Sequence, residues 1–445
     1  MRRYFLSTIL LFTLSCASGP SQNPDASASD NAKSDVALFL STRSAEVEAK
    51  ALDRLKLHNV SHSDLKAILL GMLNGRTGPT GLHLNMEIEH NGNKYPYAIF
   101  APEPLVPGTS YPMIVILHGR GGNGITTIEP WIKRLRNEFI IVCPEYPLGA
   151  WWTLTAENVV LELIRKIQAQ YPTDHNRVFL AGLSNGAIGA YMIGMFFPDY
   201  FAGIVPIAGA ITERYMHFLV NLNNTPIYSI QGQDDPFFPI QFSRRINQIL
   251  SDMKYPVTYR EHTEIGSAHG GHFLPESEIP ALYDWLKTQK RNINPPAVRM
   301  TREENHLDRI QWARISKGRK LAALQIPGPG EEITNLHDGK IASLFATHKE
   351  RNEFEIIGQN LLEYEIYLNS DQVDFDQPIT VTSQQLLAKD SKLVTGDQAV
   401  SFFGKVDKDM TVLLQEYKAR RDPYLLYDAK VKITFEKEIE TAWNR

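Results

Sequence analysis

This sequence has little cysteine, almost no excess charge of either sign and no long hydrophobic run. Its 445 residues include two cysteines, Cys16 and Cys143, which excludes a disulfide-stapled scaffold and a four-cysteine zinc site. The 46 lysines and arginines nearly balance the 50 aspartates and glutamates, and the resulting net charge of −4 argues against a dedicated nucleic-acid-binding protein. No segment approaches the roughly 20 consecutive apolar residues that a membrane-spanning helix needs.

The rest of the composition is that of a folded globular protein. Hydrophobic residues make up 43% of the chain and charged residues 22%. At roughly 150 residues per domain, the length favours two or three domains.

The first residues have the pattern of an export signal. Arg2 and Arg3 precede a short apolar run over residues 4–14, which predicts a signal peptide over residues 1–17 rather than a membrane span. Two processing routes remain open: Cys16 becomes the lipid-modified first residue of a bacterial lipoprotein, or a peptidase cuts after Ala17. We therefore expect a lipid-anchored protein of the cell envelope, or a periplasmic or secreted one. The small polar residues that follow predict a flexible tether over residues 18–35.

Hydrophobic periodicity divides the remainder into three parts. Residues 36–81 contain helical spacing and end in a glycine-rich linker. Residues 82–295 begin with a hairpin around Asn91-Gly92 and continue as short apolar strands that alternate with helices. This alternation predicts an α/β domain with a doubly wound, mostly parallel sheet covered on both faces. Residues 296–445 have the pattern of a β-rich domain, a sandwich being one option, with one helix over 410–420.

A candidate nucleophile lies between a predicted strand and a predicted helix. Residues 182–186 read Gly-Leu-Ser-Asn-Gly, so that Ser184 occupies a tight turn between the strand 178–181 and the helix 186–196. Glycines on both sides permit a strained turn that exposes the serine hydroxyl above the sheet. The N-terminus of the following helix favours developing negative charge.

A serine nucleophile needs a general base and a group that orients the base. Asp235 follows the predicted strand 227–230 in a Gly/Pro turn and is the preferred acid, with Asp234 as the alternative. His269 follows the next strand in a glycine-rich loop and is the preferred base, because it lies nearer the strand end, with His272 as the alternative. A zinc site at this His-x-x-His pair has no third ligand at sensible spacing, so we expect no metal.

Stabilisation of an oxyanion needs further hydrogen-bond donors. A glycine-rich loop follows the buried strand 113–117, and its backbone N–H at Arg120 or Gly121, together with that of Asn185, is predicted to serve. Its glycine spacing does not match a nucleotide-binding loop, so no cofactor is expected. Three further side chains are candidate substrate contacts, namely His118, Trp151 and Trp152.

These motifs together resemble the α/β-hydrolase fold. Residues 82–290, with Trp151-Trp152, Tyr171-Pro172-Thr173-Asp174 and the Ser184 turn, resemble in particular the polyhydroxybutyrate depolymerase and feruloyl esterase-like group of secreted esterases. They are also similar to the catalytic domain of prolyl-oligopeptidase-type enzymes. The resemblance implies a serine esterase that acts on a small-molecule or polymer ester. Two alternatives stay open: a serine peptidase with the same triad, and a surface binding protein that has lost activity.

Overall fold

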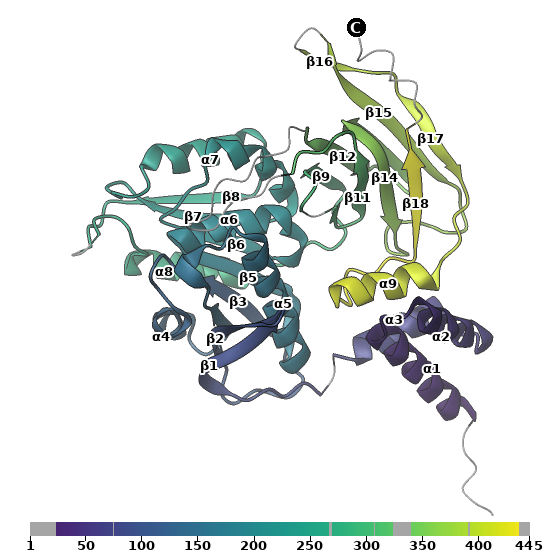
Figure 1. The fold of residues 1–445 in the computed structure, drawn as a ribbon, viewed down its shortest axis with the longest axis horizontal. Coiled ribbons are helices and arrows are strands. Elements are labelled where there is room, and N and C mark those ends of the chain that lie inside the picture. Colours follow the sequence, from purple (N-terminus) through teal and green to yellow (C-terminus); the bar gives the residue numbers. More distant parts are fainter. Residues whose placement is uncertain are drawn as a thin grey trace, which may run out of the picture. The chain divides into compact units, whose positions relative to one another are not determined.

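The computed structural model describes residues 24–73, 75–266, 269–306, 308–323, 340–389 and 392–435 (Figure 1). The chain forms two compact units, Met1–Ile68 and Leu69–Arg445. The predicted signal peptide, residues 1–17 with Cys16, lies outside the described residues. Within the described ranges, no helix combines the length and apolarity required to cross a bilayer.

The first unit is helical, and part of it was predicted to be a flexible tether. It contains α1 (Pro24–Ser41), α2 (Ala45–Leu57) and most of α3 (His62–Gly71). The predicted tether over 18–35 is wrong for residues 24–35, which belong to α1. The small polar residues of this segment indicated a tether, but Ala32, Val36 and Phe39 are spaced three to four residues apart and form a buried apolar face of the helix. Asp35 at the end of the supposed tether accepts a 2.6 Å hydrogen bond from Arg54 of α2.

The second unit begins with an eight-stranded sheet. The strand order is β1-β2-β4-β3-β5-β6-β7-β8, in which β1 and β2 are antiparallel to their neighbours and the remaining pairs are parallel. The hairpin at Asn91-Gly92 is confirmed, with φ of 50° and 77° at the two residues. The strands are β1 (Gly81–His90), β2 (Asn93–Ala101), β3 (Tyr111–Leu117), β4 (Ile140–Pro144), β5 (Thr173–Leu183), β6 (Gly203–Ile207), β7 (Ile227–Gly232) and β8 (Val257–His262).

Helices cover both faces of this sheet, as predicted. Alternate residues of β3 point to opposite cores: Met113 and Val115 lie in one cluster, Ile114 and Ile116 in the other. The first cluster also takes side chains from α5 (Leu154–Gln170), α6 (Asn185–Phe196) and α7 (Ile240–Asp252). The second takes them from α4 (Gly124–Leu135) and α8 (Ile279–Thr288). A 3₁₀ segment, η3 (Glu213–Asn224), was not predicted.

The β-rich region consists of two sheets that share one core, as expected for a sandwich. A four-stranded sheet has the order β10 (Arg309–Ile310), β11 (Ala313–Gly318), β14 (Leu361–Leu368), β18 (Ala429–Thr434). A six-stranded sheet has the order β16 (Lys392–Thr395), β15 (Ile379–Lys389), β13 (Glu353–Gln359), β12 (Ala342–His348), β9 (Ala297–Arg302), with β17 (Ala399–Gly404) paired to β15. Buried side chains of both sheets form a single cluster. The predicted helix is α9 (Met410–Arg420).

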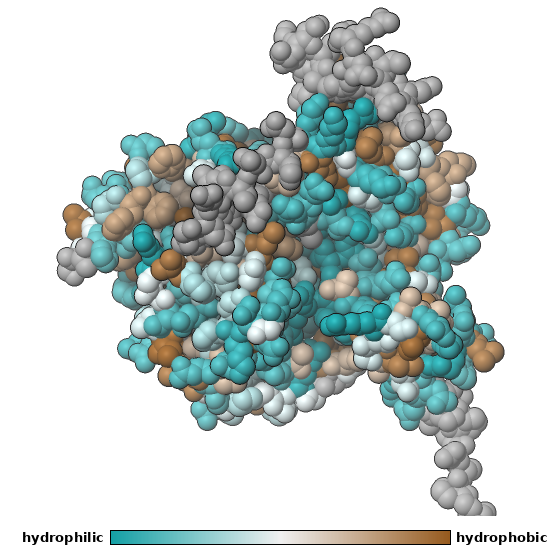
Figure 2. Space-filling view, viewed as in Figure 1, coloured by the Kyte–Doolittle hydropathy of each residue, from teal (hydrophilic) through white to brown (hydrophobic). Residues whose placement is uncertain are grey.

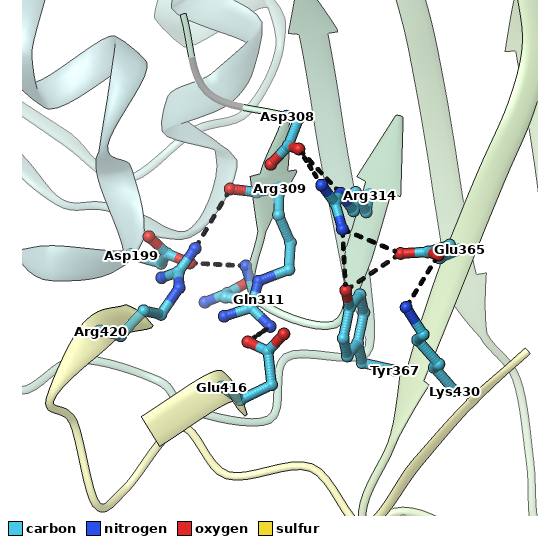
Figure 3. Close-up of polar contacts among 10 residues, drawn as sticks. All are labelled: Asp199, Asp308, Arg309, Gln311, Arg314, Glu365, Tyr367, Glu416, Arg420 and Lys430. Carbon is cyan, nitrogen blue, oxygen red and sulfur yellow. Dashed lines mark hydrogen bonds and ion pairs between the residues drawn. The ribbon is translucent and has the colours of Figure 1, made fainter. Parts of the chain in front are cut away.

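Buried polar contacts join the β-rich region to the α/β region within this unit. Asp199, just beyond α6 in η2 (Pro198–Tyr200), accepts hydrogen bonds of 2.7 Å from the Gln311 backbone N–H and from Arg420 of α9 (Figure 3). Arg291 donates 2.6 Å to Asp422 and 2.8 Å to the Asp199 carbonyl. The face seen in Figure 2 is mostly hydrophilic, with apolar residues in small separate patches.

Candidate active site

Ser184 occupies a strained turn between β5 and α6. Its φ and ψ are 59° and −119°, a conformation that non-glycine residues seldom adopt. The glycines on either side are required by close backbone approach: a Cβ on Gly182 would lie 2.1 Å from the Gly186 carbonyl oxygen, and one on Gly186 would lie 2.0 Å from that of Leu117. The Ser184 N–H donates to the Ile207 carbonyl of β6 at 3.0 Å, which fixes the turn on the sheet. The predicted strand–turn–helix context is confirmed.

Asp235 and His272 form a hydrogen-bonded pair in the loops after β7 and β8. His272 Nδ1 lies 2.8 Å from Asp235 Oδ2, and both side chains are largely buried. Because β5, β7 and β8 run parallel, Ser184 and this pair lie at the same carboxyl edge of the sheet. The alternative acid, Asp234, has an exposed side chain. Asp235, the preferred acid, is therefore paired with a histidine, and that histidine is His272.

The hydrogen bonds around Asp235 keep it ionised. Burial by itself raises the pKa of this carboxyl, but the hydrogen bonds from His272 and from the N–H groups of Phe238 and Phe237 outweigh burial, so the pKa lies below its usual value. The two backbone donors are 3.0 and 2.8 Å from Oδ1.

The structure does not bring the preferred base, His269, to Asp235. Gly266 and Gly270 pair backbone to backbone, so that His269 lies exposed near the end of the turn, edge-on to the Phe237 ring. Gly271 instead packs on the end of β7, where a Cβ on Gly232 would lie 2.2 Å from the Gly271 carbonyl oxygen. This close approach carries the next residue, His272, to the acid. His269 lies nearer the strand end, but the close packing of Gly271 on Gly232, which only glycines permit, brings His272 to Asp235 instead.

The loop after β3 lies directly against the nucleophile. A Cβ on Gly119 would be 3.2 Å from Ser184 Cβ and 3.8 Å from its Oγ. Gly121, with φ of 77°, lies in the turn closed by the 3.1 Å hydrogen bond from the Gly122 N–H to the Gly119 carbonyl. Asn185 is the first residue of α6, where backbone N–H groups have no partner within the helix. Asn185 therefore adjoins Ser184 in the chain, and Gly119, which was not predicted, approaches it in space, while Arg120 and Gly121 lie in the turn that follows Gly119.

Two of the three predicted substrate contacts are wrong, because their side chains are buried beneath this loop. Trp151 is fully buried, and its indole N–H donates to the His118 carbonyl at 2.8 Å. His118 Nδ1 bonds the Gly119 carbonyl at 2.7 Å, and its Nε2 accepts from the Tyr146 N–H at 3.2 Å. Burial lowers the pKa of His118, which fits the neutral tautomer that these bonds require. Both side chains support the loop after β3. Trp152, the third predicted contact, is half-buried against the main core.

Part of the α/β region matches a known protein family. Residues 153–289, which contain the Ser184 turn, Asp235 and His272, match the model of the phospholipase/carboxylesterase family. This α/β region has the α/β-hydrolase fold, and the family that its sequence matches is one of esterases. The match ends before the β-rich region of the chain.

Solved structures that are similar to this chain include esterases. A thermostable esterase is 24% identical, over 46% of this chain and 62% of that chain, with a TM-score of 0.39. A phospholipase/carboxylesterase from Dyadobacter fermentans is 18% identical, over 48% of this chain and 98% of that chain, with a TM-score of 0.35. A ferulic acid esterase is 19% identical, over 47% and 97%, with a TM-score of 0.38. No curated protein matches the sequence.

Proposed function

We propose that the hydrolase unit cleaves carboxylic esters by an acyl-enzyme mechanism in which Ser184 is the nucleophile, His272 the base and Asp235 the orienting acid. The observation that supports this assignment best is the Asp235–His272 hydrogen bond at the same sheet edge as the strained Ser184 turn. The same role for His269 has no comparable support, since its ring lies exposed.

In this mechanism His272 takes the Ser184 hydroxyl proton as Oγ attacks the ester carbonyl. The backbone N–H groups of Asn185 and of Arg120 or Gly121 donate hydrogen bonds to the oxyanion that forms on the carbonyl. The imidazolium then protonates the departing alkoxide, and a water molecule attacks the acyl-enzyme with His272 again as base. Asp235 holds the imidazole orientation and stabilises its charged form. No cofactor is needed.

The exposed side chains beside the pair suit apolar ester groups. Phe237 is 58% exposed and meets the His272 ring edge-on at 4.9 Å. Leu148 is 49% exposed, and its carbonyl accepts a 3.0 Å hydrogen bond from the side chain of Asn185, the residue after Ser184. Together they offer apolar surface to the acyl or the alcohol part of a small-molecule or polymer ester.

A fluorophosphonate probe tests this proposal. We expect the probe to label the wild-type protein at Ser184, to leave Ser184→Ala unlabelled, and aryl esters to be hydrolysed much faster than the matching anilides. A folded wild-type protein that takes no label would favour the inactive binding protein. Faster cleavage of the anilides would favour the peptidase.

The export signal leads to a second experiment. We propose that the mature chain begins at lipid-modified Cys16, or at Ser18 after cleavage behind Ala17, and that the protein works in the cell envelope or outside the cell. Mass spectrometry of the protein from its native host should find one of these two N-termini. A mature protein that retains Met1 would refute both.

A further inference from the structure

Gln231 lies behind the acid of the triad and contacts it directly. It is the residue before Gly232 at the end of β7 and is 1% exposed. Its Nε2 donates to Asp235 Oδ2 at 2.9 Å, the same oxygen that pairs with His272, and to the Phe238 carbonyl at 3.1 Å. Ser243 of α7, which is fully buried, donates its hydroxyl proton to Gln231 Oε1 at 3.0 Å.

These partners allow only one orientation of the amide. Nε2 faces a carboxylate and a carbonyl oxygen, both of which only accept hydrogen bonds. The rotated amide would place Oε1 against two oxygens and Nε2 against the Ser243 hydroxyl, with the loss of both donor contacts. Ser243 thus fixes the orientation of the amide, and the amide holds the carboxylate at the same oxygen that the imidazole contacts.

We propose that Gln231 is a positioning residue for the Asp235–His272 pair, with Ser243 acting through it. The inference rests on the proposed function, since it gives Gln231 a role only if Asp235 orients the catalytic base. Gln231 shares the lone pairs of Oδ2 with His272. It therefore restricts the carboxylate to the plane that the imidazole needs and reduces the negative charge available to the imidazolium.

Removal of this donor has two effects on catalysis that differ from loss of fold. In Gln231→Met, which preserves the side-chain length, Asp235 Oδ2 loses one of its two hydrogen bonds and is held less firmly, and kcat should fall by roughly 10-fold or more with KM little changed. The carboxylate also directs more of its charge to His272, which stabilises the imidazolium. The acidic limb of the rate–pH profile should therefore move to higher pH. A merely structural side chain would change the amount of folded enzyme and leave this limb in place.

Four further variants make the test specific. Ser243→Ala should lower kcat less than Gln231→Met does, and the double variant should be no slower than Gln231→Met alone, because Ser243 acts only through Gln231. Gln231→Glu should lose activity progressively with rising pH, because the new carboxyl donates while protonated and repels Asp235 when ionised. Gln233→Met is the matched control: Gln233 is exposed and its side chain bonds Glu261 at 3.4 Å, so its kinetics should equal those of the wild type.

The outcomes separate this inference from the proposed function. If Asp235→Asn abolishes hydrolysis while Gln231→Met keeps the wild-type kcat and acidic limb, the positioning role is refuted and the triad stands. Multiplicative losses in the double variant would refute the link through Ser243. If Asp235→Asn itself retains full activity, the proposed triad fails first. Should Gln231→Met not fold, the Ser243→Ala and Gln231→Glu profiles decide the matter.

Discussion

His272→Ala is expected to lower ester hydrolysis by on the order of 10³-fold or more, whereas His269→Ala should retain most of the wild-type rate. Only His272 is held by Asp235, at 2.8 Å, and only a histidine bridged between acid and nucleophile can take the serine proton in the correct tautomer. The measurement is kcat/KM on a soluble aryl ester for both variants, with circular dichroism to establish that each is folded.

The two variants control for one another, since they lie in one loop and remove the same side chain. His269 contacts the exposed Phe237 ring, so a modest change in KM is compatible with a substrate contact. The reverse ranking would return the base role to His269 and would require the loop to rearrange when substrate binds. Equal, small losses in both variants would count against a histidine base altogether.

The nucleophile could be predicted from the sequence and the base could not, and the reason is physical. The residue types that permit the strained Ser184 turn lie within five consecutive residues, because Gly182 and Gly186 are the two positions at which a Cβ would collide with backbone. The position of His272 depends on the packing of Gly271 on Gly232, two residues far apart in the chain whose contact no local pattern reveals. Long-range packing also decided that Trp151 supports the loop from within.

Features of the fold were likewise predicted well where they depend on local sequence patterns and poorly where they depend on contacts between distant residues. Apolar periodicity over β3 and the helices predicted a doubly wound sheet, because buried elements impose regular spacing on the sequence. The tether over 18–35 was predicted from small polar residues, yet Ala32 and Val36 are sufficient to bury one face of α1. Gln231 carried a weak signal of its own: an amide at the end of an apolar strand needs buried partners.

Replacement of His306 is expected to destabilise the second unit by about 3–5 kcal/mol, the range for a buried ion pair that loses one partner. The His306 ring stacks on Phe196 at the end of α6, with ring centroids 3.7 Å apart, and bonds Glu303 through Nδ1. Its Nε2 lies 3.4 Å from Glu157 of α5. His306→Leu keeps roughly the volume and the contact with Phe196 but removes the cation that lies between the two buried carboxylates. Denaturant unfolding of both proteins at pH 6.5 measures the difference.

The same cluster predicts how stability depends on pH. Burial lowers the pKa of His306, but Glu157 and Glu303 outweigh burial and raise the pKa to about 9. A histidine whose pKa rises on folding contributes stability that is complete below its unfolded value of about 6.5 and is lost as pH rises through 9. Burial raises the pKa of Glu157 despite the neighbouring imidazolium, so its ionisation also costs stability as pH increases.

Wild type should therefore lose more stability than His306→Leu between pH 6.5 and 9.5, and the two unfolding curves should approach one another at the higher pH. His348→Leu is the matched control, because His348 stacks on Phe354 in the same β-rich region and its Nε2 contacts the Arg351 carbonyl rather than a carboxylate. Its effect on stability should be smaller and should not follow this pH course. A constant difference between wild type and His306→Leu across the range would mean that His306 stabilises the unit by packing alone. If the two stabilities instead converge as the pH rises, the difference comes from the positive charge of His306, which lies between Glu157 of α5 and Glu303 of the β-rich region.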